Sequence, residues 1–560
     1  MRMFAGLAVL LILALVVPTV EGRDPVYGRK AMVVAQEDLA ADVGVSILRA
    51  RGNAVDAAVA VGFALAVTHP YAGNLGGGGF MLVRMADGRA TFIDFREKAP
   101  GKASRDMYLD AQGNPTRDSV VGWQSVGVPG TVRGFELAHE KYGRKQWAEL
   151  VKPAVALAEK GFPVSRSQMD SWRRAAPLLS RFPESQRIFL KGGAFYDWQE
   201  TFRQPELART LRRIARWGAR DFYEGETAHL LADAMAKNGG LITLADLHDY
   251  QAVERAPLEG DYKGYHIITS PPPSSGGIGL LQMLAMLSTT GCEKYGAGSA
   301  EAYHYMAEVM RRFFADRSQY LGDPDFVKNP ISALLEPAYV RSRAATIEPE
   351  HATPSDAVNP GLPAGGEGTN TTHYDIVDAE GNAVAVTYTL NDGYGSGVTV
   401  PGAGFLLNDE MDDFTAKAGA PNMFGLVQGE ANAIAPGKRP LSSMVPTIIL
   451  KDGKPFLVLG APGGPVIITA VLQAILNVVD FGMNVQDAVD FPRVHQQWKP
   501  DRLDVEAGVS PDTIALLRRM GYAVDVGNPE VTARVEAIEI RDGWLRGGHD
   551  GRGPGKAEGY

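Results

Sequence analysis

Apolar and polar positions alternate in four stretches of this 560-residue chain, and an acidic residue followed by glycine interrupts each stretch. Such a pair between two alternating runs is a strong local signal for a β-hairpin. The predicted hairpins cover residues 80–95, 373–390, 447–459 and 537–545. Because they lie in both halves of the chain, we expect sheets that combine segments distant in sequence.

Helical patterns fill much of the remaining chain. Residues 31–68 predict two helices, with Asn53 as the N-cap of the second. Residues 54–67 are nearly all apolar, but they are too few to cross a bilayer and include Asp56, which favours a buried core helix. The stretch 122–310 is mostly helical in pattern. Helices packed outside sheets give an α+β layered body.

The overall composition narrows the function classes. A net charge of −9 argues against nucleic acid as a partner. The single cysteine, Cys292, excludes an internal disulfide framework and a thiolate metal cluster. We predict no metal and no cofactor, since no histidine stands at ligand spacing near the acidic cluster of residues 408–413.

The first 22 residues have the pattern of a targeting segment. Arg2 precedes an apolar run over residues 7–17, and Pro18 opens a short stretch that could hold a cleavage point. The run is short for a membrane-spanning helix, although an uncleaved anchor remains the alternative. We therefore expect residues 1–22 to be a signal peptide and the mature protein to be exported.

A threonine after a glycine-rich approach is the candidate nucleophile. Residues 354–368 are rich in proline and glycine, and the hairpin that contains Thr371 follows them. If the Thr371 hydroxyl attacks the peptide bond after Asn370, the cut gives Thr371 a free α-amine. This amine has a pKa of ~7.7–8.0 and could act as the general base of its own hydroxyl. The approach is either a plain linker or a segment whose release uncovers the site.

Two polar residues close the same hairpin. Thr389 and Asn391 stand at the end of its second strand. In an antiparallel pair this end returns beside the start of the first strand, which would bring both residues near Thr371. They would then orient its amine and hydroxyl. The alternative is that both are exposed polar turn residues.

Three further groups could hold a charged substrate. Residues 408–413 contain four carboxylates, which suit an ammonium group or else a solvated acidic turn. Arg96 ends a predicted strand and could clamp a carboxylate bidentately, or could form a structural ion pair. Ser442 and Ser443 lie in a turn that could present two hydroxyls to a carboxylate.

A glycine pair and a run of four glycines have different predicted roles. Gly463 and Gly464 precede an apolar helix over residues 466–479, and backbone N–H groups at such a position suit an oxyanion. A tight strand-to-helix turn is the alternative. The run of residues 76–79 lacks the ending of a phosphate loop and leads into a strand, so close backbone packing is its expected role.

At these residues the sequence closely resembles the γ-glutamyltranspeptidases (glutathione hydrolases) of the N-terminal nucleophile superfamily. The motifs that carry the resemblance are residues 52–58, 74–80, 271–277, 370–374 and 440–444, in that order, and the match runs from about residue 28 to Tyr560. The resemblance implies Thr371 as the nucleophile for both self-cleavage and catalysis, with Thr389 activating it. It implies that the α-ammonium contacts are Asn391, Glu410 and Asp413. It implies that the α-carboxylate contacts are Arg96, Ser442 and Ser443, and that Gly463 and Gly464 form the oxyanion hole.

The implied fold is a four-layer αββα sandwich assembled from two chains cut from one precursor, a large subunit of residues 23–370 and a small subunit of residues 371–560. The implied activity is transfer of the γ-glutamyl group of glutathione and related amides to water, or to an amino acid or dipeptide acceptor. Two departures stand out. Many family members carry a lid tyrosine where the corresponding segment of this chain, residues 418–429, has Phe424, so a lid here would close by packing without that hydroxyl. Pro465 replaces a Ser-Arg pattern, and proline suits the first helical position.

Two alternatives stay open at the level of sequence. A related cephalosporin acylase would remove a glutaryl group, but that group lacks the ammonium that an acidic cluster suits. An uncleaved exported binding protein is the second alternative, and a denaturing gel separates it from a cleaved enzyme. The resemblance to bacterial members favours the periplasm, with secretion into the medium as the other destination.

Overall fold

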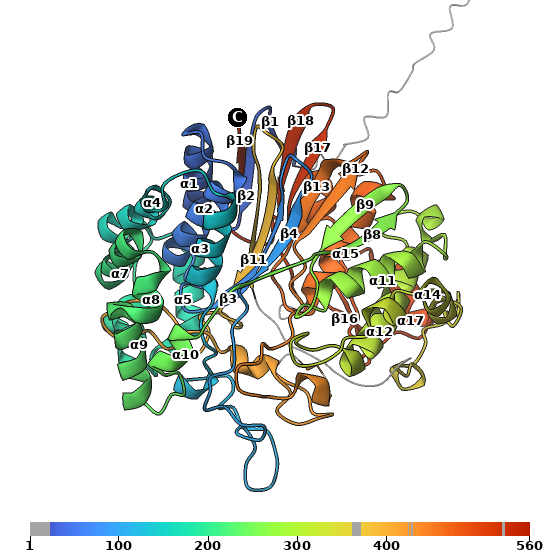
Figure 1. The fold of residues 1–560 in the computed structure, drawn as a ribbon. Coiled ribbons are helices and arrows are strands. Elements are labelled where there is room, and N and C mark those ends of the chain that lie inside the picture. The colour runs from blue at the N-terminus through green and yellow to red at the C-terminus, as the bar shows by residue number, and fades with distance from the viewer. Residues whose placement is uncertain (1–22, 361–370, 424, 427–428, 529–531) are drawn as a thin grey trace, which may run out of the picture.

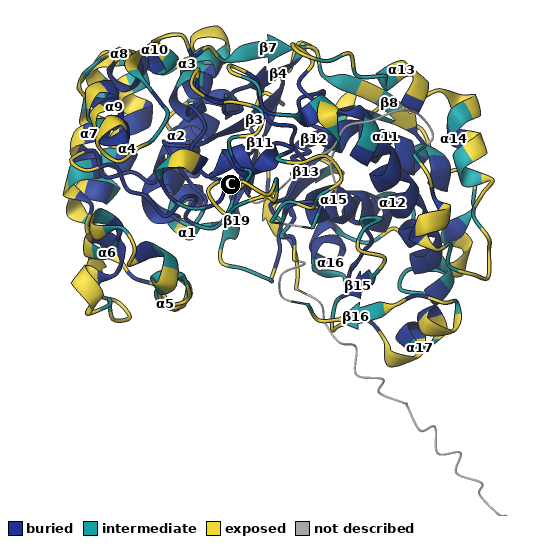
Figure 2. Ribbon diagram, turned by 90° about the horizontal axis from the view of Figure 1, so that it is seen from below, coloured by how far each residue is buried: buried dark blue, intermediate teal, exposed yellow. Residues whose placement is uncertain are grey.

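Two seven-stranded antiparallel sheets pack face to face at the centre of the molecule, between two groups of helices (Figure 1). The computed structural model describes residues 23–360, 371–423, 425–426, 429–528 and 532–560. Helices cover the outer face of each sheet, so the order of layers is αββα (Figures 1 and 2). The fold expected from the sequence is therefore confirmed.

The first sheet joins the strands that precede and follow the candidate nucleophile. Its order is β19 (Lys556–Gly559), β2 (Met32–Ala35), β10 (Thr372–Val377), β11 (Ala383–Thr389), β3 (Gly78–Arg84), β4 (Ala90–Asp94) and β7 (Val253–Arg255). Hydrogen-bonded neighbours thus come from both ends and the middle of the chain. Two of the predicted hairpins, β3–β4 and β10–β11, form the centre of this sheet.

The second sheet contains the other two predicted hairpins, β12–β13 and β17–β18. Its order is β1 (Val26–Gly28), β18 (Trp544–His549), β17 (Glu536–Arg541), β13 (Lys454–Gly460), β12 (Thr447–Lys451), β9 (Tyr265–Thr269) and β8 (Leu258–Tyr262). Smaller sheets are formed by β5 (Phe162–Pro163) and β6 (Thr201–Phe202), and by β14 (Val494–His495), β15 (Leu503–Val505) and β16 (Val524–Val526).

The first group of helices packs against the sheet that contains β10. It consists of α1 (Asp38–Arg49), α2 (Ala54–Thr68), α3 (Thr131–Tyr142), α4 (Trp147–Lys160), α5 (Arg166–Leu179), α6 (Pro183–Phe189), α7 (Pro205–Trp217), α8 (Ala219–Glu224), α9 (Glu226–Lys237) and α10 (Leu244–His248). Of these, α1, α2 and α3 contact the sheet directly, and most of the others build a further shell.

The second group covers the sheet that contains β13. It consists of α11 (Gly276–Leu287), α12 (Ala300–Tyr320), α13 (Ile331–Leu334), α14 (Pro337–Ala344), α15 (Val466–Val479), α16 (Val485–Asp490) and α17 (Pro511–Arg519). Helices α11, α15 and α16 contact the sheet, and α12 packs on α11. Among the described residues, no helix is long and apolar enough to cross a membrane.

Strand β3 shows how the period-two pattern builds this core. Phe80 and Leu82 belong to the cluster that fills the space between the sheets, whereas Met81 and Val83 join the cluster under the first group of helices. Successive side chains of a strand point to opposite faces, so one apolar run can serve two cores. Both faces of this sheet are therefore buried.

Helix α2 is buried along its whole length, as its composition predicts. Asn53 and Asp56 form a capping box, in which each side chain accepts a hydrogen bond of 2.9 Å from the other's backbone N–H. One correction is needed at the N-terminal side. The predicted first helix does not begin near residue 31, because Met32–Ala35 is strand β2, paired with both β10 and β19. Helix α1 begins only at Asp38.

Candidate functional site

Thr371 immediately precedes β10 and is 4% exposed. The register pairs Thr372 with Tyr388, so one further step places Thr371 opposite Thr389, the last residue of β11. Thr389 Oγ1 accepts a hydrogen bond of 2.8 Å from the backbone N–H of Asn391. The hairpin thus gathers these three residues at one end of the sheet. Asn370 lies outside the described residues.

Asn391 connects this end of the hairpin to the acidic segment. Its backbone adopts φ +80°, an uncommon conformation for a residue with a side chain. Its Nδ2 donates a hydrogen bond of 3.1 Å to the carbonyl oxygen of Asp409, which directly precedes Glu410. The alternative of exposed polar turn residues is wrong, because Thr389 and Asn391 are both buried.

The glycine run before β3 lets the backbones come close at this point. A Cβ on Gly77 would lie 1.9 Å from the carbonyl oxygen of Thr389, and a Cβ on Gly78 would lie 2.8 Å from Glu97 Oε2. No side chain fits at either position. Close packing, the role expected for residues 76–79, is therefore confirmed.

Arg96 forms the centre of a buried charge cluster. Its guanidinium makes ion pairs with Glu410 and Asp413, which lie at the two ends of a single 3-10 turn, and its Nη1 lies 3.6 Å from Glu97 Oε2. We call these four residues the inner cluster. Every member is fully buried. The sequence left open whether Arg96 forms an ion pair, and the structure shows that it does.

The inner cluster contains three carboxyl groups and one guanidinium. Burial raises the pKa of Glu410 and of Asp413 well above the ordinary range, while Arg96 opposes the rise. Burial also raises the pKa of Glu97 to about 7, again against the effect of Arg96. The cluster thus has fewer positive than potential negative charges, and a bound cation would lower the pKa of all three carboxyl groups.

Several acceptor oxygens in this region lack a hydrogen-bond donor among the described residues. They are Glu97 Oε1 and Oε2, Asn391 Oδ1, Glu410 Oε2 and Asp413 Oδ1. Buried polar atoms are normally satisfied, so a group of acceptors without donors points to a ligand rich in N–H groups. The sequence analysis missed Glu97. Its position directly after Arg96 was the available signal.

The two serines lie beside Arg96. Arg96 donates hydrogen bonds of 3.2 and 3.3 Å to the carbonyl oxygens of Pro440 and Leu441, the residues just before Ser442. Ser442 Oγ accepts from the backbone N–H of Met444 at 3.1 Å, and Ser443 Oγ accepts from Arg317 at 3.0 Å. A hydroxyl that accepts such a bond still has its own proton to donate, as a carboxylate ligand requires.

Gly463 and Gly464 form the turn between β13 and α15 and adopt φ +129° and +70°. A Cβ on Gly463 would lie 2.6 Å from the carbonyl oxygen of Thr532. Neither N–H group donates a hydrogen bond to a described residue. Two unused donors at a helix N-terminus are what an oxyanion site needs. Pro465 precedes the first helical residue, Val466.

A cleft of about 1200 Å³ opens beside this turn. Gly463 and Asp392, the neighbour of Asn391, both line it, and so do Met423 and Gly425. The predicted lid residue Phe424 lies outside the described residues. We call this space the outer cleft.

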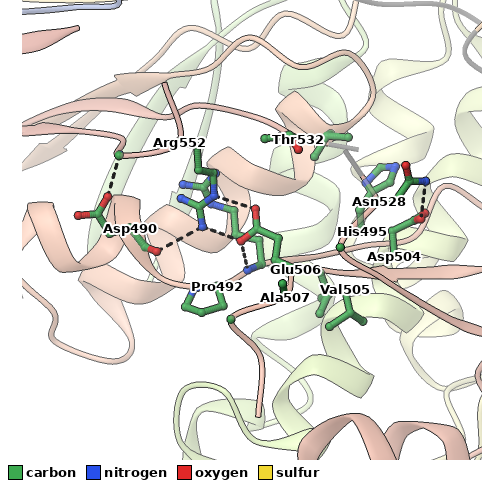
Figure 3. Close-up of a pocket in the computed structure, with 16 residues that line it drawn as sticks. Asp490, Pro492, His495, Asp504, Val505, Glu506, Ala507, Asn528, Thr532 and Arg552 are labelled. Carbon is green, nitrogen blue, oxygen red and sulfur yellow. Dashed lines mark hydrogen bonds and ion pairs between the residues drawn. The ribbon is translucent and has the colours of Figure 1, made fainter. Parts of the chain in front are cut away.

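A second cavity of about 420 Å³ adjoins the outer cleft and shares Arg552 with it (Figure 3). Its charges are already paired. Arg552 forms ion pairs of 2.6 Å with Glu506 and 2.9 Å with Asp550. Within the described ranges, no group of three or more His, Cys, Asp or Glu side chains is arranged to hold a metal ion.

Comparisons with known proteins identify the family of this chain. A family model described as gamma-glutamyltranspeptidase matches residues 40–560. A glutathione hydrolase proenzyme of Pseudomonas sp. (strain A14) is 51% identical over 92% of this chain and 90% of its own length. The protein of the same name from Escherichia coli (strain K12) is also 51% identical, over 94% and 91%.

Among solved structures, a cephalosporin acylase from Bacillus halodurans has a TM-score of 0.86 and 28% identity, and the match covers 98% of this chain and 99% of that one. The family match extends through the hairpin of Thr371, the inner cluster and the Gly463–Gly464 turn. This chain belongs to the gamma-glutamyltranspeptidase family.

Proposed function

We propose that this protein is a self-cleaving γ-glutamyltransferase and glutathione hydrolase. The inner cluster carries the proposal. Its three carboxyl groups outnumber its one guanidinium, and several of its oxygens have no hydrogen-bond donor among the described residues, which suits an ammonium group. The serine hydroxyls beside the cluster suit a carboxylate. A γ-glutamyl group ends in an amino-acid zwitterion, which presents those two charges together.

In this proposal each end of the zwitterion has its own contacts. The α-ammonium binds Asn391, Glu410 and Asp413, with Glu97 as an additional acceptor. The α-carboxylate binds Arg96, Ser442 and Ser443. Holding both charges places the side-chain amide over Thr371, and positioning of this kind can supply several kcal/mol of a reaction barrier.

The chemistry then uses one residue twice. In the precursor, Thr371 Oγ attacks the carbonyl carbon of Asn370, and the C–N bond breaks, which gives an ester and frees the peptide nitrogen as the α-amine of Thr371. Water then hydrolyses the ester, which leaves a carboxylate on Asn370 and restores the Thr371 hydroxyl. In the mature enzyme the same oxygen attacks the γ-carbonyl of the substrate, while the α-amine accepts the hydroxyl proton and passes it to the leaving amine. Thr389 orients the nucleophile.

The N–H groups of Gly463 and Gly464 stabilise the oxyanion of the tetrahedral intermediate. The γ-glutamyl ester on Thr371 then reacts with water, which gives glutamate, or with the amine of an amino acid or dipeptide, which gives a new γ-glutamyl amide. In both cases the proton returns to the Thr371 hydroxyl. No cofactor is needed for this sequence.

The cut divides the precursor into residues 23–370 and 371–560, which we expect to stay associated. Strands β10 and β11, from the second fragment, lie between β2 and β3 from the first. Three further strand pairs, β1–β18, β9–β12 and β2–β19, also join the two fragments. Separating the fragments would break the hydrogen bonds of all five pairs and expose both cores. The mature protein is therefore a heterodimer in this proposal, and residues 1–22 direct its export, to the periplasm in preference to the medium.

The central test compares the wild type with Thr371→Ala and Thr371→Ser. We expect the wild type to give two fragments on a denaturing gel, the smaller one beginning Thr-Thr-His-Tyr. Thr371→Ala should stay one chain and be inactive, while Thr371→Ser should still cleave, because it keeps the hydroxyl. Cleavage of the alanine variant at the same bond would refute the mechanism.

A glutaryl acylase is the second candidate, because the fold also matches that of a cephalosporin acylase. The oxygens of the inner cluster that lack a hydrogen-bond donor among the described residues disfavour it, since a glutaryl group has no ammonium. Hydrolysis of γ-glutamyl and glutaryl 4-nitroanilides separates the two. We expect a preference of at least 100-fold for the γ-glutamyl compound.

A further inference from the structure

The outer cleft contains an arginine whose side chain has no partner among the described residues. Arg534 lines this cleft, and its side chain makes no hydrogen bond or ion pair with any residue in the described part of the chain. It is half-buried. Of the other arginines that line the cleft, Arg502 and Arg552 are paired with carboxylates, and Arg174 is exposed to solvent. A guanidinium without a carboxylate in a partly buried cleft is a ready site for an anion.

Hydrogen bonds through Gln36 connect the Arg534 backbone to the end of the first sheet that holds Thr371. Its carbonyl oxygen accepts a hydrogen bond of 3.3 Å from Gln36 Nε2, and Gln36 Oε1 accepts one of 3.1 Å from the hydroxyl of Thr372. Thr372 directly follows the candidate nucleophile. Ala533, the residue before Arg534, packs against Gly463, with its Cα 2.7 Å from where a Cβ on that glycine would stand.

A second polar group in the cleft lacks a partner. His69, the C-cap of α2, is 7% exposed, and its Nε2 has no hydrogen-bond partner within the described part of the chain. Burial, together with the nearby charge of Arg534, lowers the pKa of His69 to about 3. The imidazole is therefore neutral and can donate one hydrogen bond without adding charge. Tyr71, Asp392 and Arg174 are the other titratable groups on this side of the cleft.

The position of the cleft indicates which part of a substrate it would receive. The inner cluster is closed off from solvent, so it can hold only the γ-glutamyl end. The outer cleft is lined by Gly463, where the reacting carbonyl lies in the proposed function, and by no residue of the inner cluster. The group on the far side of the scissile amide must therefore lie in the outer cleft.

We propose that Arg534, assisted by His69, binds the terminal carboxylate of the leaving peptide and of an amino acid or dipeptide acceptor. This inference rests on the proposed function, because it assigns the opposite end of the same substrates. The site would favour glutathione over amides with uncharged leaving groups. It would also favour acceptors with a free carboxylate over their amides.

The first experiment needs no variant. Wild-type enzyme is assayed with glutathione, with its C-terminal glycine amide and with γ-glutamyl 4-nitroanilide. We expect KM for the glycine amide to be at least about tenfold higher than for glutathione, since a charge-assisted bidentate contact is lost. Equal KM values would overturn the inference. Failure to hydrolyse any of the three would instead overturn the proposed function.

The second experiment compares Arg534→Gln, Arg534→Lys and Arg173→Gln. Arg173 is an exposed residue of α5 that does not line the cleft, so it serves as the control. For Arg534→Gln we expect a rise in KM for glutathione of about tenfold, with hydrolysis of the anilide unchanged within about twofold. Arg534→Lys should restore part of the preference, and Arg173→Gln should change nothing.

Acceptor use provides an independent readout. Wild type should transfer the γ-glutamyl group to glycylglycine in preference to glycylglycine amide, and Arg534→Gln should lose this preference. If Arg534→Gln lowers activity on the anilide and on glutathione equally, its role is structural and the inference fails. If it changes neither the substrate nor the acceptor preference, the inference also fails.

Discussion

The inner cluster and the outer cleft differ in how their arginine side chains are buried and paired. In the cluster, Arg96 is fully buried and ion-paired to Glu410 and Asp413 before any ligand binds. In the cleft, Arg534 is half-buried and has no partner among the described residues. Paired buried charges fix one ligand geometry, because a wrong ligand leaves a desolvated group unmatched. An open, unpaired charge accepts many ligands at lower affinity.

The comparison teaches how one enzyme can be strict about a donor and tolerant of an acceptor. A zwitterion must match several buried atoms at once to enter the inner cluster. A peptide in the outer cleft needs only one carboxylate. The difference in burial therefore predicts a difference in selectivity, and also a difference in what each region contributes to folding stability.

Arg96→Ala should give the largest effect. Removing the guanidinium leaves three carboxyl groups without their partner, and breaking a buried ion pair typically costs about 3–5 kcal/mol. We expect an unfolding free energy lower by roughly that amount in urea titrations, and loss of γ-glutamyl anilide hydrolysis by about 10³-fold or more. Arg534→Ala, the matched change in the cleft, should cost less than about 1 kcal/mol. Equal losses of unfolding free energy in the two variants would contradict the proposed difference between the two regions.

Gly463→Ala should have an intermediate effect at the boundary between the two regions. Its φ of +129° and the 2.6 Å approach to the Thr532 carbonyl oxygen leave no room for a methyl group. We expect a stability loss of about 1–3 kcal/mol and a fall in kcat of about 10²-fold as the oxyanion donors move. Gly453→Ala is the matched control, because φ there is +75° but nothing lies within 4 Å. A fall in kcat for both variants would show that backbone strain alone is responsible.

The change of KM with pH, which follows the ionisation of Glu97, should be the smallest effect, about tenfold. Burial raises the pKa of Glu97 to about 7 in the folded protein, against ~4.3 in an unfolded chain. The folded state therefore binds more protons between these values, and its stability falls as pH rises from about 4.5 to 7. An ammonium ligand needs the ionised form, so KM for a γ-glutamyl anilide should fall as pH rises through about 7.

The variant Glu97→Gln checks this prediction, since it cannot titrate. Its KM should be nearly constant between pH 5.5 and 8.5, whereas the wild-type KM should vary. Measurements of kcat on the same samples separate this effect from titration of the Thr371 amine. An unchanged KM profile in Glu97→Gln would assign the pH dependence to another group.

Local patterns in the sequence predicted many of the building blocks of the molecule. Each Asp-Gly or Glu-Gly hairpin formed where it was expected, and Asn53 caps α2. These features depend on neighbours a few residues apart, which is why the sequence contains them. The short strand Met32–Ala35 was missed, because its four apolar residues match a helix as well as a strand.

The tertiary structure alone decided which charges meet and how deeply they are buried. Arg96 and Glu410 are 314 residues apart, and no local pattern states that their side chains form an ion pair in a solvent-free space. Arg534 has nothing in sequence to distinguish it from a surface charge, and Glu97 has only its position directly after Arg96. Their pairing, or lack of it, depends on contacts between distant strands and on the water excluded around them, and only the folded chain sets these.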